Sequence, residues 1–208
     1  MYTVLLLVIF TLLFLRWYMY NPFRGKSVIV VGNSRELLKK KYGELIDKHD
    51  IVIRLNNFMI DGYEEHVGSK VNGAHINHWS ISKDFYDDVC KRAEPYGGMK
   101  WFGTRNFTSY CMRFGMSPYD RRIFNYRSHL SPCKNPTSGT IALANIIPLC
   151  DKPVTIIGLG GFSEPGYYYS NDSSKTHKSW RTAHAQHCPE QEQIFINTMI
   201  SEGLVKKL

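Results

Sequence analysis

The pattern of apolar and polar positions divides the chain into short apolar runs separated by segments with helical periodicity. Short continuous apolar runs, bounded by glycine or polar residues, are typical of buried parallel strands. The candidate strands lie at 28–31, 51–55, 75–77, 99–102, 122–124 and 154–158. Because helical segments separate several of them, the sequence predicts one α/β domain with a mostly parallel sheet flanked by helices.

The helical segments have identifiable beginnings. Ser34 is a candidate N-cap for the helix after the first strand. The apolar segment 138–150 reads as a buried helix, and Pro189 stands near the first position of a third one. The residues expected to face the core are Leu37, Leu38 and Tyr42 in the first helix, and Ile194, Phe195 and Met199 in the third.

The first 20 residues differ in character from the rest. Residues 1–15 contain no charge, and Arg16 and an aromatic border follow them. The apolar stretch approaches the minimum length of a membrane span, whereas the basic start and the cleavage site of a signal peptide are missing. We therefore predict a membrane anchor over 1–20, a short stem over 21–26 and a single domain over 27–208.

The orientation of this anchor is left open by the sequence. The positive charges lie on the C-terminal side of the apolar stretch, which favours a cytoplasmic domain. Two glycosylation sequons, at Asn106 and Asn171, favour a lumenal one.

Composition and charge narrow the class of partner. The chain has 208 residues, of which 43% are hydrophobic, and its formal net charge is +8. The basic excess is diffuse and lacks an aromatic-basic platform, so we do not expect a nucleic-acid partner. The five cysteines are an odd number without a C-x-x-C pair, which predicts no zinc cluster and at most two disulfides.

Polar residues follow two neighbouring predicted strands. Gly32, Asn33 and Ser34 come after the first strand, and Asn56 comes after the second. Ligands of open α/β sheets bind at these strand ends, and an amide suits a base, a ribose or a phosphate. Both asparagines are equally explained as turn residues. Ser34 replaces the second glycine of a dinucleotide fingerprint and the acidic ribose ligand is missing, which disfavours an NAD-dependent oxidoreductase.

Two helix beginnings add further candidate residues. Thr137, Ser138 and Gly139 open the apolar helix, where hydroxyls and backbone N–H groups form an anion site, although Ser138 is also explained as an N-cap. His187 stands just before the last helix, where the helix dipole favours a neutral imidazole able to accept a proton. Glu192 is five residues further on and could hydrogen-bond the turn that positions His187.

The ordered set of motifs resembles the eukaryotic-type sialyltransferases of glycosyltransferase family 29. The resemblance covers residues 26–200. The segments that resemble the long motif of the family are 30–34, 51–56 and 62–70, those that resemble its short motif are 136–139, 149–151 and 157–160, and His187 with Glu192 resembles its last motif.

The resemblance implies a single Rossmann-like domain, of the sialyltransferase GT-A-variant type, that uses CMP-sialic acid as donor and needs no metal or cofactor. The implied catalytic residues are His187, as general base, and Glu192. The implied donor-binding residues are Asn33, Ser34, Asn56, Thr137, Ser138, Gly139 and Tyr167. A glycan hydroxyl would attack the anomeric carbon with inversion, in the lumen of the Golgi or of another secretory-pathway compartment.

Two departures from the family leave alternatives open. Tyr167 stands where the family has a histidine. The alternative is that His177 or His184 takes the role of that histidine. The long-motif cysteine that the family pairs with the equivalent of Cys150 is absent, and Val28 is near its place. The alternatives are a transferase for another CMP-sugar such as CMP-Kdo, and an inactive, membrane-tethered relative that binds glycans.

Overall fold

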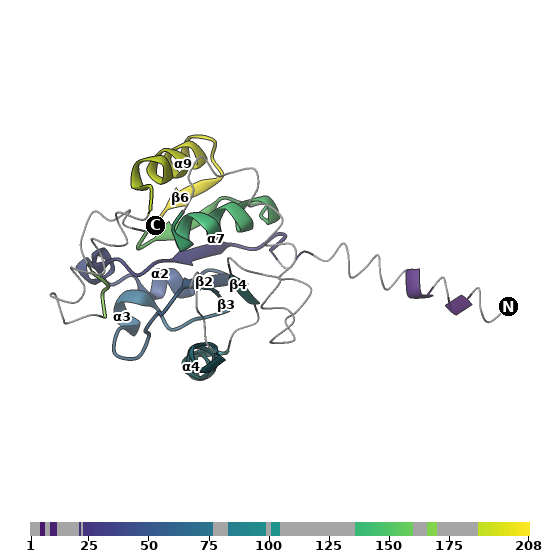
Figure 1. Cartoon of the computed structure of the whole chain (residues 1–208), viewed down its shortest axis with the longest axis horizontal. Helices are drawn as coiled ribbons and strands as arrows, with labels where there is room; N and C mark the ends of the chain where they lie inside the picture. The colour runs from purple at the N-terminus through teal and green to yellow at the C-terminus, as the bar shows by residue number, and fades with distance from the viewer. Residues whose placement is uncertain are drawn as a thin grey trace.

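Six strands form one parallel sheet in the computed structural model of the chain (Figure 1). The structure describes residues 5–6, 9–11, 21, 23–76, 83–98, 101–104, 136–159, 166–169 and 187–208. The strands are β1 (Val28–Val31), β2 (Ile51–Leu55), β3 (Gly73–Ile76), β4 (Trp101–Thr104), β5 (Val154–Ile157) and β6 (Val205–Lys207). Their order is β4-β3-β2-β1-β5-β6, and every neighbouring pair is parallel. The predicted fold class is confirmed.

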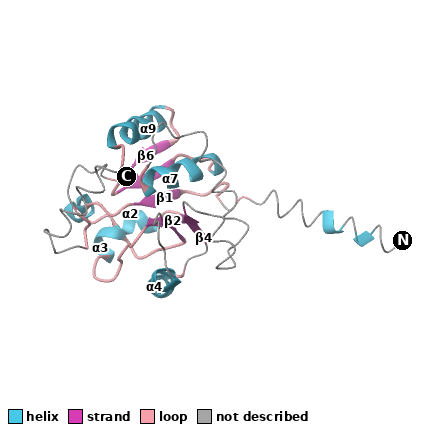
Figure 2. Cartoon of the chain, in the orientation of Figure 1, coloured by secondary structure: helices cyan, strands magenta, loops and turns pink. Residues whose placement is uncertain are grey.

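Helices cover both faces of the sheet. They are η1 (Arg35–Lys39), α2 (Gly43–Asp47), α3 (Glu64–Val67), α4 (Lys83–Ala93), η2 (Glu94–Tyr96), α7 (Ser138–Ile146), η3 (Ile147–Leu149) and α9 (Pro189–Ser201), where η marks a 3-10 helix. In Figures 1 and 2, α7 and α9 lie on one side of the strands, and α2, α3 and α4 lie on the other.

The central position of β1 in the sheet explains why its sequence is continuously apolar. Val28 and Val30 pack in the core beneath α7, while Ile29 and Val31 pack on the opposite face with Leu37. All four β1 residues are buried because helices cover both faces of the sheet.

The helix predicted after Ser34 is shorter than expected. The Ser34 side chain accepts a hydrogen bond from the Glu36 backbone N–H, as a capping residue should. The segment is a five-residue 3-10 helix, because Lys40 adopts an extended backbone that ends it. The chain then turns into α2, where Gly43 lies against the backbone of Glu64.

The buried face of α9 also differs from the prediction. Ile194 is 66% exposed, whereas Ile196 is buried and both Phe195 and Met199 pack against the core. The buried stripe includes Glu192, four residues before Ile196. A reading of apolar residues alone placed the stripe incorrectly, because a carboxylate occupies one of its positions.

Other predicted segments vary in outcome. β4 begins two residues later than the predicted strand, and the candidate strand 122–124 lies outside the described residues. Neither α4 nor β6 is predicted by the apolar pattern of the sequence.

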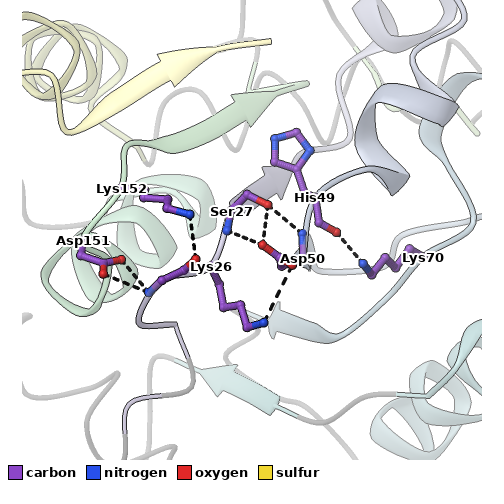
Figure 3. A network of polar contacts seen from close by, with 8 residues as sticks. Lys26, Ser27, His49, Asp50, Lys70, Asp151 and Lys152 are labelled. Atoms are coloured by element: carbon purple, nitrogen blue, oxygen red, sulfur yellow. Dashed lines mark hydrogen bonds and ion pairs between the residues drawn. The ribbon is translucent and has the colours of Figure 1, made fainter.

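The described residues of the predicted stem, 21 and 23–26, lie at the amino edge of the sheet, where Figure 3 labels Lys26. The Phe23 side chain is buried in the core beneath α7. The Gly25 N–H donates to Asp151 Oδ1 at 2.8 Å, and Lys152 Nζ donates to the Gly25 carbonyl at 2.8 Å. These contacts fasten the start of the domain to the edge opposite the predicted site.

The same edge carries a second polar contact. The Asp50 carboxylate accepts hydrogen bonds from the backbone N–H and the hydroxyl of Ser27, each at 2.8 Å, and these bonds lower the pKa of Asp50 (Figure 3). They join the residue before β1 to the residue before β2.

The described part of the N-terminal segment presents apolar side chains to solvent, namely those of Leu5, Leu6, Ile9 and Phe10. Among the described residues, none of the helices combines the length and the apolar character that a membrane crossing requires.

Candidate active site

The candidate site lies at the carboxyl edge of the sheet, beside the switch in strand order. From β1 the chain adds β2, β3 and β4 on one side, and then returns to place β5 on the other side of β1. The connections after β1 and β5 therefore leave in opposite directions, and α/β sheets bind ligands at such a point. Here the two loops touch: the Gly32 N–H donates to the Ile157 carbonyl at 2.8 Å, and the Ser34 N–H donates to Gly158 at 3.1 Å.

The close approach of the two loops requires a glycine at position 32. A Cβ atom at position 32 would overlap the carbonyl oxygen of Gly158, which is backbone and cannot swing away. We expect Gly32→Ala to lower the free energy of unfolding by about 2 kcal/mol, as an overpacked substitution does. Urea denaturation followed by circular dichroism measures this change, and a midpoint equal to that of the unmodified chain would contradict it.

Asn33 and Asn56 lie at the ends of adjacent parallel strands, as predicted. Asn33 Nδ2 donates to the Leu55 carbonyl at 2.8 Å and so joins the ends of β1 and β2. Asn33 is only 8% exposed, and within the described part of the chain its Oδ1 atom has no hydrogen-bond partner. A buried acceptor without a donor costs about 1–3 kcal/mol, so this oxygen is suited to a ligand that supplies one.

Asn56 serves as a turn residue and also as part of the polar cluster. Its φ angle of 51° is in the left-handed region, which asparagine tolerates better than most residues. Its Oδ1 atom accepts a hydrogen bond from Ser138 Oγ at 3.1 Å. The two interpretations that the sequence left open for Asn56 therefore both apply.

The N-cap of α7 is not the residue that the sequence suggested. The N-cap is Thr137, whose hydroxyl accepts from the Thr140 backbone N–H, and not Ser138. Ser138 is the first residue of the helix and is free to turn its hydroxyl to Asn56. At Gly139 a Cβ atom would lie 2.9 Å from the Leu159 side chain, so the glycine allows the helix to begin close to the loop after β5. The first N–H groups of a helix have no acceptor within it, and they can bind an anion.

Glu192 contacts the beginning of α7. Its carboxylate, on a residue only 6% exposed, accepts from the Thr137 backbone N–H at 3.0 Å and from the hydroxyls of Thr137 and Thr140. From the sequence, Glu192 was a candidate to hydrogen-bond the turn around His187 instead. Thr140 was not among the predicted site residues, because a hydroxyl inside an apolar helix gives no sequence signal.

His187 lies at the beginning of α9, on the turn that carries Glu192. Cys188, the N-cap residue of α9, is disulfide-bonded, and Pro189 opens the helix. The imidazole is therefore attached to a constrained helix end that meets the beginning of α7.

Tyr167 lies beside the loop after β1. It forms an isolated antiparallel bridge with Ser34, and the next residue, Tyr168, donates its N–H to the Asn33 carbonyl at 3.1 Å. The Tyr167 ring is 48% exposed and stacks on Tyr169 with 5.4 Å between ring centroids. His177 and His184, the alternatives to Tyr167, lie outside the described residues.

Arg54, from the long motif, supports the fold beneath the site. Its guanidinium is fully buried and donates to the carbonyls of Val67, Gly68 and Lys70 at 2.8 to 3.1 Å. Burial lowers its pKa to about 10, so the side chain remains charged near neutral pH. The Asp47 carboxylate accepts from the Lys70 backbone N–H at 2.9 Å. The segment 67–70 of the long motif is thus fixed by hydrogen bonds with the side chains of Arg54 and Asp47.

Cys150 is a free thiol, and burial raises its pKa to about 12. The thiol is therefore not paired, in line with the absence of the long-motif cysteine that the family resemblance would pair with it. A thiol with so high a pKa is chemically inert near neutral pH.

A parallel sheet covered on both faces, with amides and hydroxyls gathered beside its switch point, defines a Rossmann-like α/β domain with a candidate ligand site at its carboxyl edge. The model of glycosyltransferase family 29 (sialyltransferase) matches residues 16–99. A beta-1,6-galactosyltransferase of Arabidopsis thaliana is 59% identical over 74 residues, which are 36% of this chain and 18% of the relative. An alpha-2,3-sialyltransferase of Gallus gallus is 27% identical over 175 residues, which cover 74% of this chain and 50% of the relative.

Solved sialyltransferases share the fold. A mammalian sialyltransferase in complex with Gal-beta-1-3GalNAc-ortho-nitrophenol superimposes with a TM-score of 0.54 at 18% identity, covering 93% of this chain and 72% of that one. The Campylobacter jejuni sialyltransferase CstII, in complex with the substrate analogue CMP-3FNeuAc, gives a TM-score of 0.62 at 16% identity and covers 88% and 81%. The chain is thus similar to glycosyltransferase family 29 over residues 16–99, which are less than half of its length. It spans half the length of the chicken relative and about a fifth of the plant one.

Proposed function

We propose that the chain is an inverting sialyltransferase that moves sialic acid from CMP-sialic acid to a hydroxyl of a glycan acceptor. One observation carries the proposal: among the described residues the buried Asn33 Oδ1 has no hydrogen-bond partner, and the Asn33 amide bonds to Leu55, which directly precedes the Asn56 that pairs with Ser138. The match to the family model supports the reaction class, and solved sialyltransferases that share the fold are in complex with CMP or with the substrate analogue CMP-3FNeuAc.

In the proposed reaction, the carboxyl-edge residues hold the nucleotide part of the donor. Asn33 accepts from a donor group of CMP, Asn56 and Ser138 complete the polar edge, and the first N–H groups of α7 face the phosphate. Ser34, Thr137, Gly139 and Tyr167 line the same region in this proposal. Preorganised N–H and hydroxyl donors stabilise the charge that develops on the phosphate as CMP leaves.

His187 is the proposed general base. The acceptor hydroxyl oxygen forms a bond to the anomeric carbon of sialic acid while the bond from that carbon to the phosphate oxygen breaks. The hydroxyl proton passes to the imidazole of His187, and both electrons of the broken bond leave with CMP. Attack opposite the leaving group inverts the configuration.

We propose that neither a metal nor a resident cofactor takes part, in keeping with a sequence that lacks an Asp-x-Asp metal-binding pair. Transfer is then expected to continue at full rate in excess EDTA. A requirement for added Mn²⁺ or Mg²⁺ would contradict this part of the proposal.

The deciding experiment incubates the purified full chain with CMP-sialic acid and a panel of glycans, and measures both CMP release and the mass of each glycan. We expect CMP release together with a glycan mass gain of one sialic acid, and nuclear magnetic resonance then gives the anomeric configuration of the product. CMP binding without transfer or donor hydrolysis would replace the enzyme proposal with the inactive, glycan-binding relative.

The plant relative favours a second candidate, a galactosyl donor. It is named a beta-1,6-galactosyltransferase, and its matched segment has the highest identity among the relatives reported above. UDP-galactose is therefore a separate arm of the same assay, and CMP-Kdo is another. Transfer from UDP-galactose alone would establish the second candidate, and transfer from CMP-Kdo alone would establish the related keto-sugar acid as the donor.

We also propose that residues 1–20 anchor the domain in a membrane of the Golgi or of another secretory-pathway compartment, with the domain in the lumen. The exposed apolar side chains of Leu5, Leu6, Ile9 and Phe10 support contact with lipid. The full chain is then expected to resist carbonate extraction from membranes and to carry N-linked glycans. Release by carbonate, or a mass without glycans, would contradict the anchor and the lumenal orientation respectively.

A further inference from the structure

A buried carboxylate joins the beginnings of the two helices that carry the proposed donor-binding and base residues. Glu192, one turn into α9, accepts a hydrogen bond from the Thr137 backbone N–H at 3.0 Å. It also accepts bonds from the hydroxyls of Thr137 and Thr140 at the beginning of α7. Glu192, Thr140 and the neighbouring Ser138 are all buried, so these bonds form away from water.

The two helices reach this contact from distant parts of the chain. Glu192 is 55 residues beyond Thr137 and 52 beyond Thr140, so local sequence does not hold the helix ends together. At the beginning of α7, Ser138 follows Thr137 and donates its hydroxyl to Asn56 Oδ1 at 3.1 Å. At the beginning of α9, the Glu192 N–H donates to the carbonyl of Cys188 at 3.0 Å, and Cys188 directly follows His187.

Thr140 has a particular part in this arrangement. Thr137 bonds to Glu192 through its backbone as well as its side chain, and its hydroxyl is shared with the N-cap bond to Thr140. The Thr140 hydroxyl, by contrast, lies inside the helix and donates to Glu192. Its removal changes the contact between the helices while the cap of α7 is retained.

We propose that Thr140 is a positioning residue, which together with Glu192 and Thr137 sets the distance between the donor-binding residues and the general base His187. This inference rests on the proposed transferase function. None of the three side chains has to touch the reacting atoms, because they act through the relative position of α7 and α9. Misplacement of a base by about 1 Å can cost about a hundredfold in rate, so a small shift of α9 is sufficient.

The test compares Thr140→Val, Thr140→Ser and Glu192→Gln in the full chain, with the donor that the panel identifies. Valine keeps the shape of threonine without the hydroxyl. We expect kcat to fall about tenfold in Thr140→Val and further in Glu192→Gln, while the affinity for CMP by calorimetry stays within about twofold. Thr140→Ser retains the hydroxyl and is expected to restore most of kcat.

Thr198→Val is the matched control. Thr198 is on α9, and its hydroxyl donates to the Ile194 carbonyl of the same helix at 2.9 Å, so its loss leaves the contact with α7 intact. We expect unchanged kcat in this variant. Equal kcat in Thr140→Val and the unmodified chain would overturn the inference, and so would equal losses of kcat and CMP affinity, which indicate general destabilisation.

A second readout does not need turnover. In a chain with isotope-labelled histidines, the ring signals of His187 are expected to shift in Thr140→Val and Glu192→Gln but not in Thr198→Val. Unmoved His187 signals would overturn the positioning role even if transfer is seen. If the unmodified chain transfers no sugar but the His187 signals shift in Thr140→Val and Glu192→Gln, the proposed function is rejected. The structural coupling of the two helices then still holds.

Discussion

Replacing His187 with alanine is expected to abolish transfer while the affinity for CMP stays unchanged. A general base contributes about a hundredfold to ten-thousandfold to a rate, and alanine cannot accept the proton of the acceptor hydroxyl. The proposed nucleotide-binding residues are on other elements, namely the loops after β1 and β2 and the first turn of α7, and Asn33 and Asn56 keep their contacts when the imidazole is removed. Initial rates of CMP release and calorimetry with CMP measure the two quantities separately.

His66→Ala is the control for this substitution. His66 is on α3, where its Nδ1 atom is hydrogen-bonded to the Lys40 carbonyl at 2.8 Å, and it is not among the proposed site residues. We expect nearly normal turnover in this variant. Normal turnover in His187→Ala would contradict the assignment of His187 as base, whereas a parallel loss of CMP binding would assign it to the donor site.

The second large effect concerns acid stability, and it comes from His75. This residue is on β3 between Leu55 and Gly103 in the sheet register, and it is only 2% exposed. Within the described part of the chain, neither of its ring nitrogens has a hydrogen-bond partner. Burial lowers the pKa of His75 to about 4, because the charged imidazole loses its hydration there.

The sign of the pH dependence follows from this lowered pKa. The unfolded chain binds a proton at His75 below its ordinary pKa of 6.5, whereas the folded chain binds it only below about 4. The contribution of His75 to stability is therefore complete above pH 6.5 and is lost progressively as the pH falls to 4. Linkage gives a total loss of about 3 kcal/mol across that window.

His75→Phe is expected to remove this dependence. Phenylalanine has a similar planar ring and no polar atoms to bury without partners, so we expect stability near neutral pH to be retained. Urea denaturation at several values between pH 7 and pH 4 measures the slope. His66→Phe makes the same exchange at a less buried position, and an equal change of slope in both variants would contradict the assignment to His75.

The central strands of the sheet were predictable because buried strands have continuous apolar sequences. Runs at 28–31 and 51–55 became β1 and β2 with the predicted bounds, since helices bury both faces of these strands. The short β6 was missed because only Val205 of its three residues is buried. Ile194 was assigned to the wrong face of α9 because the position of a helix stripe depends on what the helix packs against.

The sequence by itself determined the fold class and which residues lie at the carboxyl edge, because strand runs and the polar residues that follow them are local features. Asn33 and Asn56 needed no tertiary information beyond parallel pairing to be placed together. Only the tertiary structure decided that Thr137 caps α7, that Ser138 turns to Asn56 and that Glu192 bonds to Thr140. The contact of Ser138 with Asn56 joins residues 82 positions apart and follows from the packing of α7 against the end of β2. The contact of Glu192 with Thr140 joins residues 52 positions apart and follows from the packing of α7 against α9, and no local pattern encodes either arrangement.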